Sequence, residues 1–375
     1  MAFVLISAAA SPALAIPYLP ATDDAIVERL RDHPLDQNDR ELRMYRKALR
    51  ANPGQLTIAL AVAQRCIDVA RRNGDPRYIG YAEAALAPWW QRVDAPDAVR
   101  LLKAIILQSV HQFGPATQEL QTLLQHDPAN SQAWLTRASI DQVQGDYAQA
   151  QDDCRHLQDP ASADYRQVCQ AELRSLQGAA EAAYRQLEEV RFARPDLAGW
   201  LHLAEAELSE RRGDAVNTDL HYRATLAAQP EAYARGAYAD FLLDHGRPAE
   251  VVGLLAGSER ADALLLRLAL AYAALGDPRR DAAVADLQAR FDAARLRGDA
   301  VHRREEARFA LQLRNEPARA LALARENWAV QKEPADARLL LMCALAAGQD
   351  SAADDVRQFL ETHTLADVRL AAFRP

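Results

Sequence analysis

Lysine, aromatic residues and clusters of positive charge are scarce in this sequence. Lys47, Lys103 and Lys332 are the only lysines among 375 residues, aromatic residues make up 6%, and the net charge is −8 with a pI near 5.7. Domains that bind nucleic acids are typically basic, with lysine and arginine gathered on one face. The composition therefore disfavours DNA and RNA as partners.

The motifs of common catalytic and cofactor sites are also missing. The sequence has no glycine-rich phosphate loop after a strand, no nucleophile elbow and no His-Glu-x-x-His zinc helix. No segment alternates apolar and polar residues for long enough to predict a strand. Beyond the N-terminus, no apolar run approaches the length of a membrane span. We therefore expect an all-α protein that is not an enzyme, uses no cofactor and does not span a membrane.

An apolar stretch opens the chain. Residues 1–15 end in Ala13-Leu14-Ala15, the small-x-small pattern of a signal-peptidase site, and cleavage there would leave Ile16 first. No lysine or arginine precedes the apolar run, whereas a signal peptide normally has a basic start. We predict a signal peptide and export to the periplasm of a Gram-negative bacterium. A disordered leader on a cytoplasmic protein is the alternative.

Two series of helix-breaking residues recur with a period near 34. Glycine permits the positive φ that a tight turn between helices requires, and proline cannot continue a helix past its first turn. Between the markers, apolar residues recur three and four apart, as from Leu264 to Tyr272, which indicates helices. The prolines are Pro53, Pro88, Pro128, Pro160, Pro195 and Pro230, and the turn residues are Gly145, Gly178, Gly213, Gly246, Gly276, Asn315 and Gly348.

A unit of helix, turn, second helix and breaker with this period resembles the tetratricopeptide repeat. In the best-matched unit, large Trp134 stands opposite small Ala138 and Ala150. The resemblance covers residues 22 to 365 and implies that these side chains interlock between paired helices. It also implies an all-α, right-handed superhelical solenoid of antiparallel hairpins, with about nine hairpins in residues 16–365 and a C-terminal tail at residues 366–375.

The resemblance also implies a binding surface. In this family the first helix of every unit lines a concave groove that receives a peptide or a helix. Some members clamp a chaperone's C-terminal carboxylate with paired lysine and asparagine, and the lack of lysine between Lys103 and Lys332 disfavours that partner class. Each groove position could equally be an ordinary solvated residue. The residues that the analogy places in the groove are Gln132, Ser139, Gln142, Tyr165, Glu172, Glu205 and Arg235.

One unit departs from the repeat pattern. Trp89 and Trp90 follow Pro88 directly, in a unit with extra residues after its turn. Large aromatic side chains mostly serve packing, so we expect this pair to seal the junction to the next unit. A hot spot for a partner protein is the alternative.

Three scattered residues invite a metal hypothesis. His202 and Glu205 share a helix face, and His221 lies on the antiparallel neighbour. Two histidines and a carboxylate could hold zinc if they converged. Such spacings often arise by chance in a long helical chain, so packed or solvated side chains are the favoured interpretation and no metal is predicted.

The cysteines give a clearer pattern. Cys154 and Cys169 flank the connection between two antiparallel helices at equal distances, which brings them side by side. With export to an oxidising compartment, we predict a disulfide between them, and two buried thiols are the alternative. Cys66 and Cys343 are too far apart in a solenoid to pair.

These observations favour a non-catalytic scaffold or adaptor that binds a protein or peptide in the concave groove. The runner-up is a structural subunit of an envelope assembly, a polysaccharide export complex or a secretion complex. An enzyme with an active site built from repeats is a third, weakly supported class.

Overall fold

The computed structural model describes residue 22 and residues 37–159, 162–190, 197–298 and 302–373. The chain divides into two compact units, residues 1–41 and residues 42–375, and the architecture below is that of the second unit. The described residues form helices and turns and contain no strand. None of these described helices combines the length and the apolar character that a bilayer crossing requires. The predicted signal peptide, residues 1–15, lies outside the described residues.

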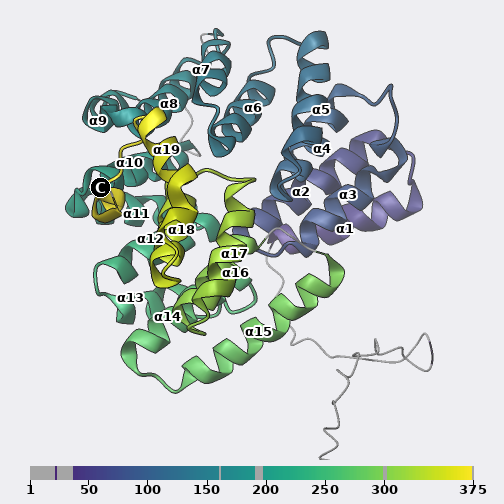
Figure 1. The fold of residues 1–375 in the computed structure, drawn as a ribbon. Coiled ribbons are helices and arrows are strands. Elements are labelled where there is room, and N and C mark those ends of the chain that lie inside the picture. The colour runs from purple at the N-terminus through teal and green to yellow at the C-terminus, as the bar shows by residue number, and fades with distance from the viewer. Residues whose placement is uncertain (1–21, 23–36, 160–161, 191–196, 299–301, 374–375) are drawn as a thin grey trace, which may run out of the picture. The chain divides into compact units, whose positions relative to one another are not determined.

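Successive helices pair as hairpins, and the described residues contain nine such pairs in a row (Figure 1). The expected all-α superhelical array of hairpins is therefore confirmed. The pairs are α2/α3, α4/α5, α6/α7, α8/α9, α10/α11, α12/α13, α14/α15, α16/α17 and α18/α19, with α1 ahead of the first. The bounds are α1 Gln37–Ala51, α2 Leu56–Asn73, α3 Arg77–Trp90, α4 Asp97–Ser109, α5 Phe113–His126, α6 Ser131–Gln144, α7 Tyr147–Arg155, α8 Ala163–Arg174, α9 Ala180–Glu188, α10 Ala198–Arg212, α11 Ala215–Ala228, α12 Ala232–Asp244, α13 Pro248–Leu255, α14 Asp262–Leu275, α15 Arg279–Arg297, α16 Arg303–Gln312, α17 Pro317–Trp328, α18 Pro334–Ala346 and α19 Asp354–Thr362, with short turns η2 Ser175–Ala179, η4 Asp350–Ala353 and η5 Val368–Phe373.

The hairpin of α6 and α7 illustrates how the sequence sets these boundaries. The Asn130 side chain accepts a hydrogen bond from the Ala133 N–H at 3.1 Å and so caps the start of α6. Gly145 ends that helix at a φ of +82°, a left-handed conformation that glycine adopts without strain. The Asp146 side chain then accepts from the Gln149 N–H at 3.1 Å and starts α7. One glycine and two polar caps thus make a complete αα turn.

The seam between α6 and α7 is packed as the repeat pattern predicts. Trp134, Ala138 and Ala150 are all buried. The Trp134 indole N–H donates to the Pro128 carbonyl at 2.9 Å, and its ring stacks on His156 with centroids 4.0 Å apart. A large side chain against two alanines lets the helices approach closely without leaving a void.

The predicted turn residues all adopt positive φ, from Gly145 to Gly348 and including Asn315. Pro53, Pro128 and Pro230 lie between helices, as expected, whereas Pro160 and Pro195 lie outside the described residues. Pro88 was expected to end its helix but lies inside α3, which continues to Trp90. The loss of stability is small because a proline in the last turn of a helix removes only one backbone hydrogen bond.

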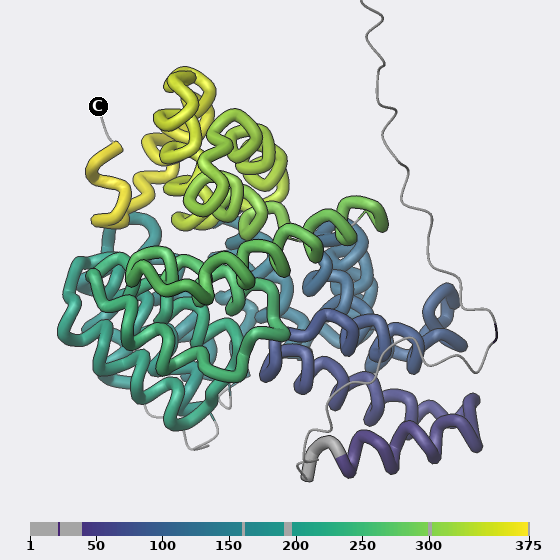
Figure 2. The backbone as a smooth tube through the Cα atoms, turned by 90° about the horizontal axis from the view of Figure 1, so that it is seen from below, coloured from purple at the N-terminus to yellow at the C-terminus, as the bar shows by residue number. Residues whose placement is uncertain are grey.

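The C-terminal helices pack over the middle of the chain. Helices α16 to α19 share one hydrophobic core with α4 to α8, formed by buried residues between 104 and 176 and between 307 and 370. Figure 2 shows the yellow C-terminal helices as a layer over the teal ones. The segment expected to be a tail belongs to this layer through residue 373, because residues 368–373 form η5 and the Leu370 side chain is buried.

The contacts of this layer run along the turns of three successive hairpins. The Lys332 N–H donates to the Val143 carbonyl at 2.7 Å, and the Ala366 N–H donates to the Leu176 carbonyl at 2.9 Å. Each turn glycine faces the C-terminal segment, and at Gly145 a Cβ would lie only 2.7 Å from the facing ring, whereas at Gly178 and Gly213 it would make ordinary contacts. The pairs of glycine and facing residue are Gly145 with Phe359, Gly178 with Thr364, and Gly213 with Val368.

A second closure joins the first hairpin to the middle of the array. The Arg235 guanidinium donates from α12 to the Arg72 carbonyl in α2 at 2.9 Å. A Cβ on Gly74 would lie 3.0 Å from the side chains of Ala232 and Ala261. Residues more than 150 positions apart in the chain therefore lie side by side.

We predict that Gly145→Ala destabilises the protein by about 2–5 kcal/mol. Left-handed alanine costs about 1–2 kcal/mol, and the new Cβ would lie 2.7 Å from the Phe359 ring, which adds about 1–3 kcal/mol of overpacking. Gly246→Ala is the matched control, because Gly246 has a φ of +67° and open space around its Cβ position. Urea denaturation measures both losses. Equal losses in the two variants would show that the contact with Phe359 contributes nothing.

Candidate functional site

Helices from distant hairpins surround one pocket, here named the inner pocket. Its walls come from α2, α10, α11, α12, α14, α16 and α18 together with η5, and its volume is about 430 Å³. On α12 the lining residues are spaced three and four apart, which is one face of a helix. Its ionisable lining residues are Arg71, Glu207, Glu210, Arg211, Tyr222, Tyr233, Asp240, Asp244, Arg267, Arg304, Glu305, Arg308, Glu333, Arg338 and Arg369.

Most of these charges are held in ion pairs between helices. Asp240 on α12 pairs with Arg267 of α14 at 2.6 Å and with Arg308 of α16 at 2.9 Å. Burial by itself raises the pKa of Asp240, but the charges of the two arginines hold that pKa below its usual value. Arg369 of η5 pairs with Glu210 of α10 at 2.9 Å. The walls of the pocket are thus joined by buried or half-buried pairs of opposite charge.

Two lining side chains remain available to a ligand. Arg71, in the last turn of α2, is exposed and forms no ion pair with another described residue. The Tyr233 side chain is 57% exposed although it lines the pocket, and its hydroxyl donates to Glu207 at 2.8 Å. A free guanidinium and an open aromatic ring therefore face the same enclosed space.

The seven residues expected in the groove lie elsewhere, and none of them lines the inner pocket as the described residues form it. Glu205 is two positions from the lining residue Glu207, so it points about 200° away around α10. Arg235 instead bonds to Ser258 at 2.9 Å and to the α2 carbonyl described above. Of the others, Gln132 and Ser139 are exposed, while Gln142, Tyr165 and Glu172 are half-buried.

The lining residues that the sequence analysis missed do carry a signal. Charged residues stand four apart in first helices at Glu207 and Arg211, at Asp240 and Asp244, and at Arg304 and Arg308. This spacing puts both members on one helix face. These pairs of charges on first helices indicate the residues that line the inner pocket more reliably than the groove positions taken from the family analogy.

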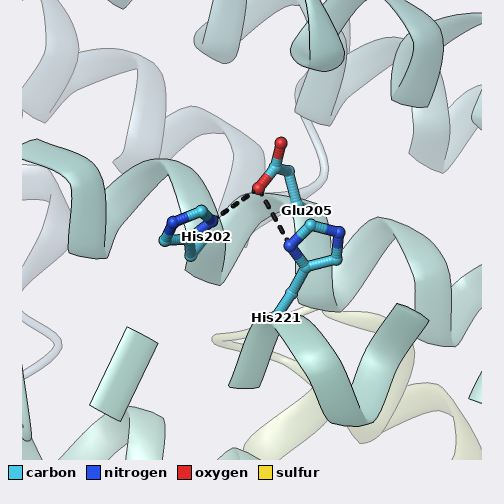
Figure 3. Close-up of side chains that lie close together, drawn as sticks. All are labelled: His202, Glu205 and His221. Atoms are coloured by element: carbon cyan, nitrogen blue, oxygen red, sulfur yellow. Dashed lines mark hydrogen bonds and ion pairs between the residues drawn. The ribbon is translucent and has the colours of Figure 1, made fainter. Parts of the chain in front are cut away.

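His202, Glu205 and His221 converge in the structure (Figure 3). The His202 Nδ1 lies 2.8 Å and the His221 Nδ1 lies 3.0 Å from the same oxygen, Oε2 of Glu205. Burial alone raises the pKa of Glu205, but hydrogen bonds from both histidines hold that pKa below its usual value. The His221 Nε2 lies 2.8 Å from the hydroxyl of Tyr184 on α9. Three helices thus meet at one carboxylate.

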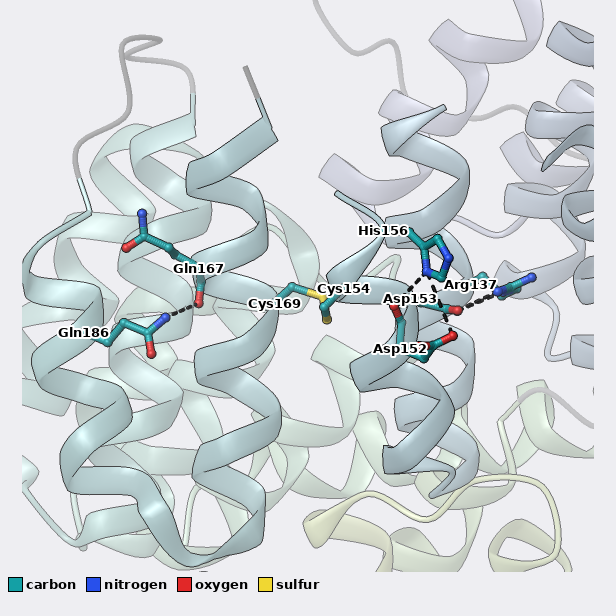
Figure 4. Close-up of a disulfide and its surroundings, with 8 residues drawn as sticks. All are labelled: Arg137, Asp152, Asp153, Cys154, His156, Gln167, Cys169 and Gln186. Atoms are coloured by element: carbon teal, nitrogen blue, oxygen red, sulfur yellow. Dashed lines mark hydrogen bonds and ion pairs between the residues drawn. A yellow bond between two sulfur atoms is a disulfide. The ribbon is translucent and has the colours of Figure 1, made fainter. Parts of the chain in front are cut away.

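Cys154 of α7 and Cys169 of α8 form a disulfide, with their Cα atoms 5.9 Å apart (Figure 4). It links the third hairpin to the fourth. Beside it, Arg137 of α6 pairs with the fully buried Asp153 at 2.5 Å. Cys66 and Cys343 are free and buried, and burial raises the pKa of the Cys66 thiol to about 11.

Trp89 and Trp90 lie at the junction of two hairpins. Trp89 is buried in the core of α1 to α4, and half-buried Trp90 packs against both that core and the next one. The Lys103 ammonium lies over the Trp90 ring at 5.2 Å and donates to its carbonyl at 2.6 Å. These contacts match packing, the role expected for the pair.

Glu172 on α8 is a half-buried carboxyl with an unusual proton affinity. Burial and the charge of Glu207 raise the pKa of this carboxyl, Arg211 lowers it, and the net result is a pKa of about 7. Between pH 4.5 and about 7, the folded protein keeps a proton on Glu172 that an unfolded chain has lost. The free energy of unfolding therefore falls as the pH rises from 4.5 to about 7.

We expect Glu172→Gln to gain stability over the wild type as the pH rises from 4.5 to 8. The relative gain should be on the order of 2 kcal/mol, because the amide is never ionised. Urea denaturation at pH 4.5, 6 and 8 measures it, with exposed Glu83→Gln as the control. A difference from wild type that is independent of pH would contradict the assignment.

The chain matches no protein-family model and no curated protein. Among solved structures, the Cut9–Hcn1 hetero-tetramer of APC/C is similar over 82% of this chain and 52% of that chain, with 15% identity and a TM-score of 0.38. This chain therefore spans about half the length of that one. A tetratricopeptide repeat protein from Parabacteroides merdae is similar over 82% and 99%, with 12% identity and a TM-score of 0.34. IFIT1 with m7Gppp-AAAA is similar over 87% and 67%, with 13% identity and a TM-score of 0.37. By its own nine hairpins and their glycine turns, the chain has a tetratricopeptide-repeat-like fold.

Proposed function

We propose that the protein is a non-catalytic scaffold that holds a short segment of a partner protein in the inner pocket. A volume of about 430 Å³ is within the range of ligand sites. It suits a few residues of an extended chain or a chain end, whereas a whole helix is about 10–12 Å wide. The open groove for a helical partner, expected from the family analogy, is replaced in this proposal by an enclosed pocket.

The chemistry of the lining supports a polypeptide ligand with a carboxylate. Arg71 offers a guanidinium that can bind a carboxylate through two parallel hydrogen bonds. Tyr233 offers an aromatic face, and Leu264, Leu339 and Met342 add apolar surface. Convergence on one pocket of an accessible tyrosine and an arginine that forms no ion pair with another described residue is the observation that carries the proposal.

The remaining charges favour binding over catalysis. Arg267 and Arg308 are both held by Asp240, and Arg338 is held by Asp244. Ion pairs that join separate hairpins keep the walls in one arrangement, so little ordering is left to occur when a ligand binds. The arginines beside Asp240 hold its pKa below the usual value, so this carboxylate stays ionised near neutral pH.

Affinity capture with two variants tests this proposal. Wild-type protein used as bait in a native envelope extract should enrich a specific protein, and Arg71→Glu should lose it by about 10–100-fold, because a charged hydrogen bond is worth about 1.5–3 kcal/mol. Arg185→Glu is the control, since the side chain of Arg185 is 68% exposed and lies outside the pocket. Undiminished capture by Arg71→Glu, or no enriched protein with the wild type, would count against a binding role for the pocket.

We further propose that residues 1–15 direct export and that the disulfide forms in the periplasm. Support comes from the small-x-small pattern at Ala13 to Ala15 and from a cysteine pair placed within bonding distance. Disulfides persist in oxidising compartments and are rare in the cytosol.

Protein recovered from the periplasm should show two reactive thiols after denaturation, from Cys66 and Cys343, and four after reduction. Reduction should also cost up to about 3 kcal/mol of stability, the loop-entropy value for a closed loop of about 15 residues. A thiol titration with and without reductant measures the first outcome, and urea denaturation measures the second. Four thiols in the unreduced native protein would exclude the bridge.

A further inference from the structure

We propose that His202, Glu205 and His221 form a binding site for one zinc ion, which ties α10 to α11. The site is separate from the inner pocket, because none of its three residues lines that pocket. The proposal also stands apart from the scaffold function, since it requires no partner protein.

The donor set is one that zinc prefers. Two imidazole nitrogens and one carboxylate oxygen, with a water in the fourth position, make a common tetrahedral zinc environment. Here each residue offers a ligand atom, and these atoms all lie within 4.8 Å of one another. Imidazole suits zinc, whereas magnesium and calcium prefer oxygen ligands alone.

The distances require only a small adjustment. Donor atoms around tetrahedral zinc lie about 3.3 Å apart, given zinc–ligand distances of about 2.0–2.1 Å. The two nitrogens now lie 2.8 Å and 3.0 Å from Glu205 Oε2. A side-chain rotation of His202 can supply the difference, because this side chain is 35% exposed while that of Glu205 is 8% exposed. The same exposed edge admits the ion and its water.

Tyr184 completes the site from a third helix. A metal-bound histidine usually donates its second ring N–H to a fixed acceptor, which sets the tautomer. The His221 Nε2 lies 2.8 Å from the Tyr184 hydroxyl. When Nδ1 of His221 binds zinc, its proton moves to Nε2, and Nε2–H then donates to the Tyr184 oxygen.

Zinc titration of the tag-free full-length protein tests the site. After removal of metal with a chelator, calorimetry should give one zinc ion per chain, and Co²⁺ should give the intense visible absorption of a four-coordinate site. Zinc should also raise the Tm, because it binds the folded chain. Absence of saturable binding would overturn the proposal.

Matched variants assign the ligands. His202→Gln and His221→Gln should each weaken zinc binding at least tenfold, and Tyr184→Phe should weaken it about 10–100-fold, the usual effect of losing an outer partner. His126→Gln should change nothing, since the side chain of His126 is 57% exposed and lies on α5. His202 is the least buried ligand, so His202→Gln with a native circular dichroism spectrum and unchanged zinc affinity would refute the site even if the other variants misfold.

Discussion

Each hairpin in this protein buries one apolar face against its partner and leaves another that only the next hairpin can cover. Stacking satisfies this need along the chain, and the core of α1 to α4 meets the next core through the shared residues Trp90 and Leu101. The last helices, α16 to α19, bury their apolar faces against α4 to α8. In an open solenoid a terminal repeat with a polar outer face would have to cover such apolar faces.

That closure depends on the same glycines that make the turns. Gly145, Gly178 and Gly213 adopt positive φ, and at Gly145 the missing Cβ also lets the Phe359 ring lie directly on the turn. One residue type thus serves local geometry and long-range packing together. The inner pocket follows from this arrangement, because first helices from both ends of the array face one enclosed space across which Asp240 and its arginines pair.

Much of the fold could be predicted from periodicity, and the candidate sites could be predicted only in part. The glycine series and Asn315 placed the predicted turns, and Pro53, Pro128 and Pro230 placed breaks between helices, since backbone preferences act within a few residues. Pro88 was the exception, because α3 continues to Trp90. Losing one hydrogen bond near the end of α3 destabilises the protein less than ending the helix two residues early. The groove residues missed the inner pocket because a shift of two positions on a helix, as from Glu205 to Glu207, turns a side chain through about 200°.

The sequence by itself determined the helices, their turns, the pairing of neighbours and the adjacency of Cys154 and Cys169, because each of these depends on residues close together in the chain. Only the tertiary structure decided that the array closes on itself, that Arg71 and Tyr233 face one pocket, and that two histidines share the Glu205 carboxylate. These features depend on the rotation of each helix about its axis and on the small angle between successive hairpins. Such angles add up over nine hairpins, and no local pattern of residues specifies their sum.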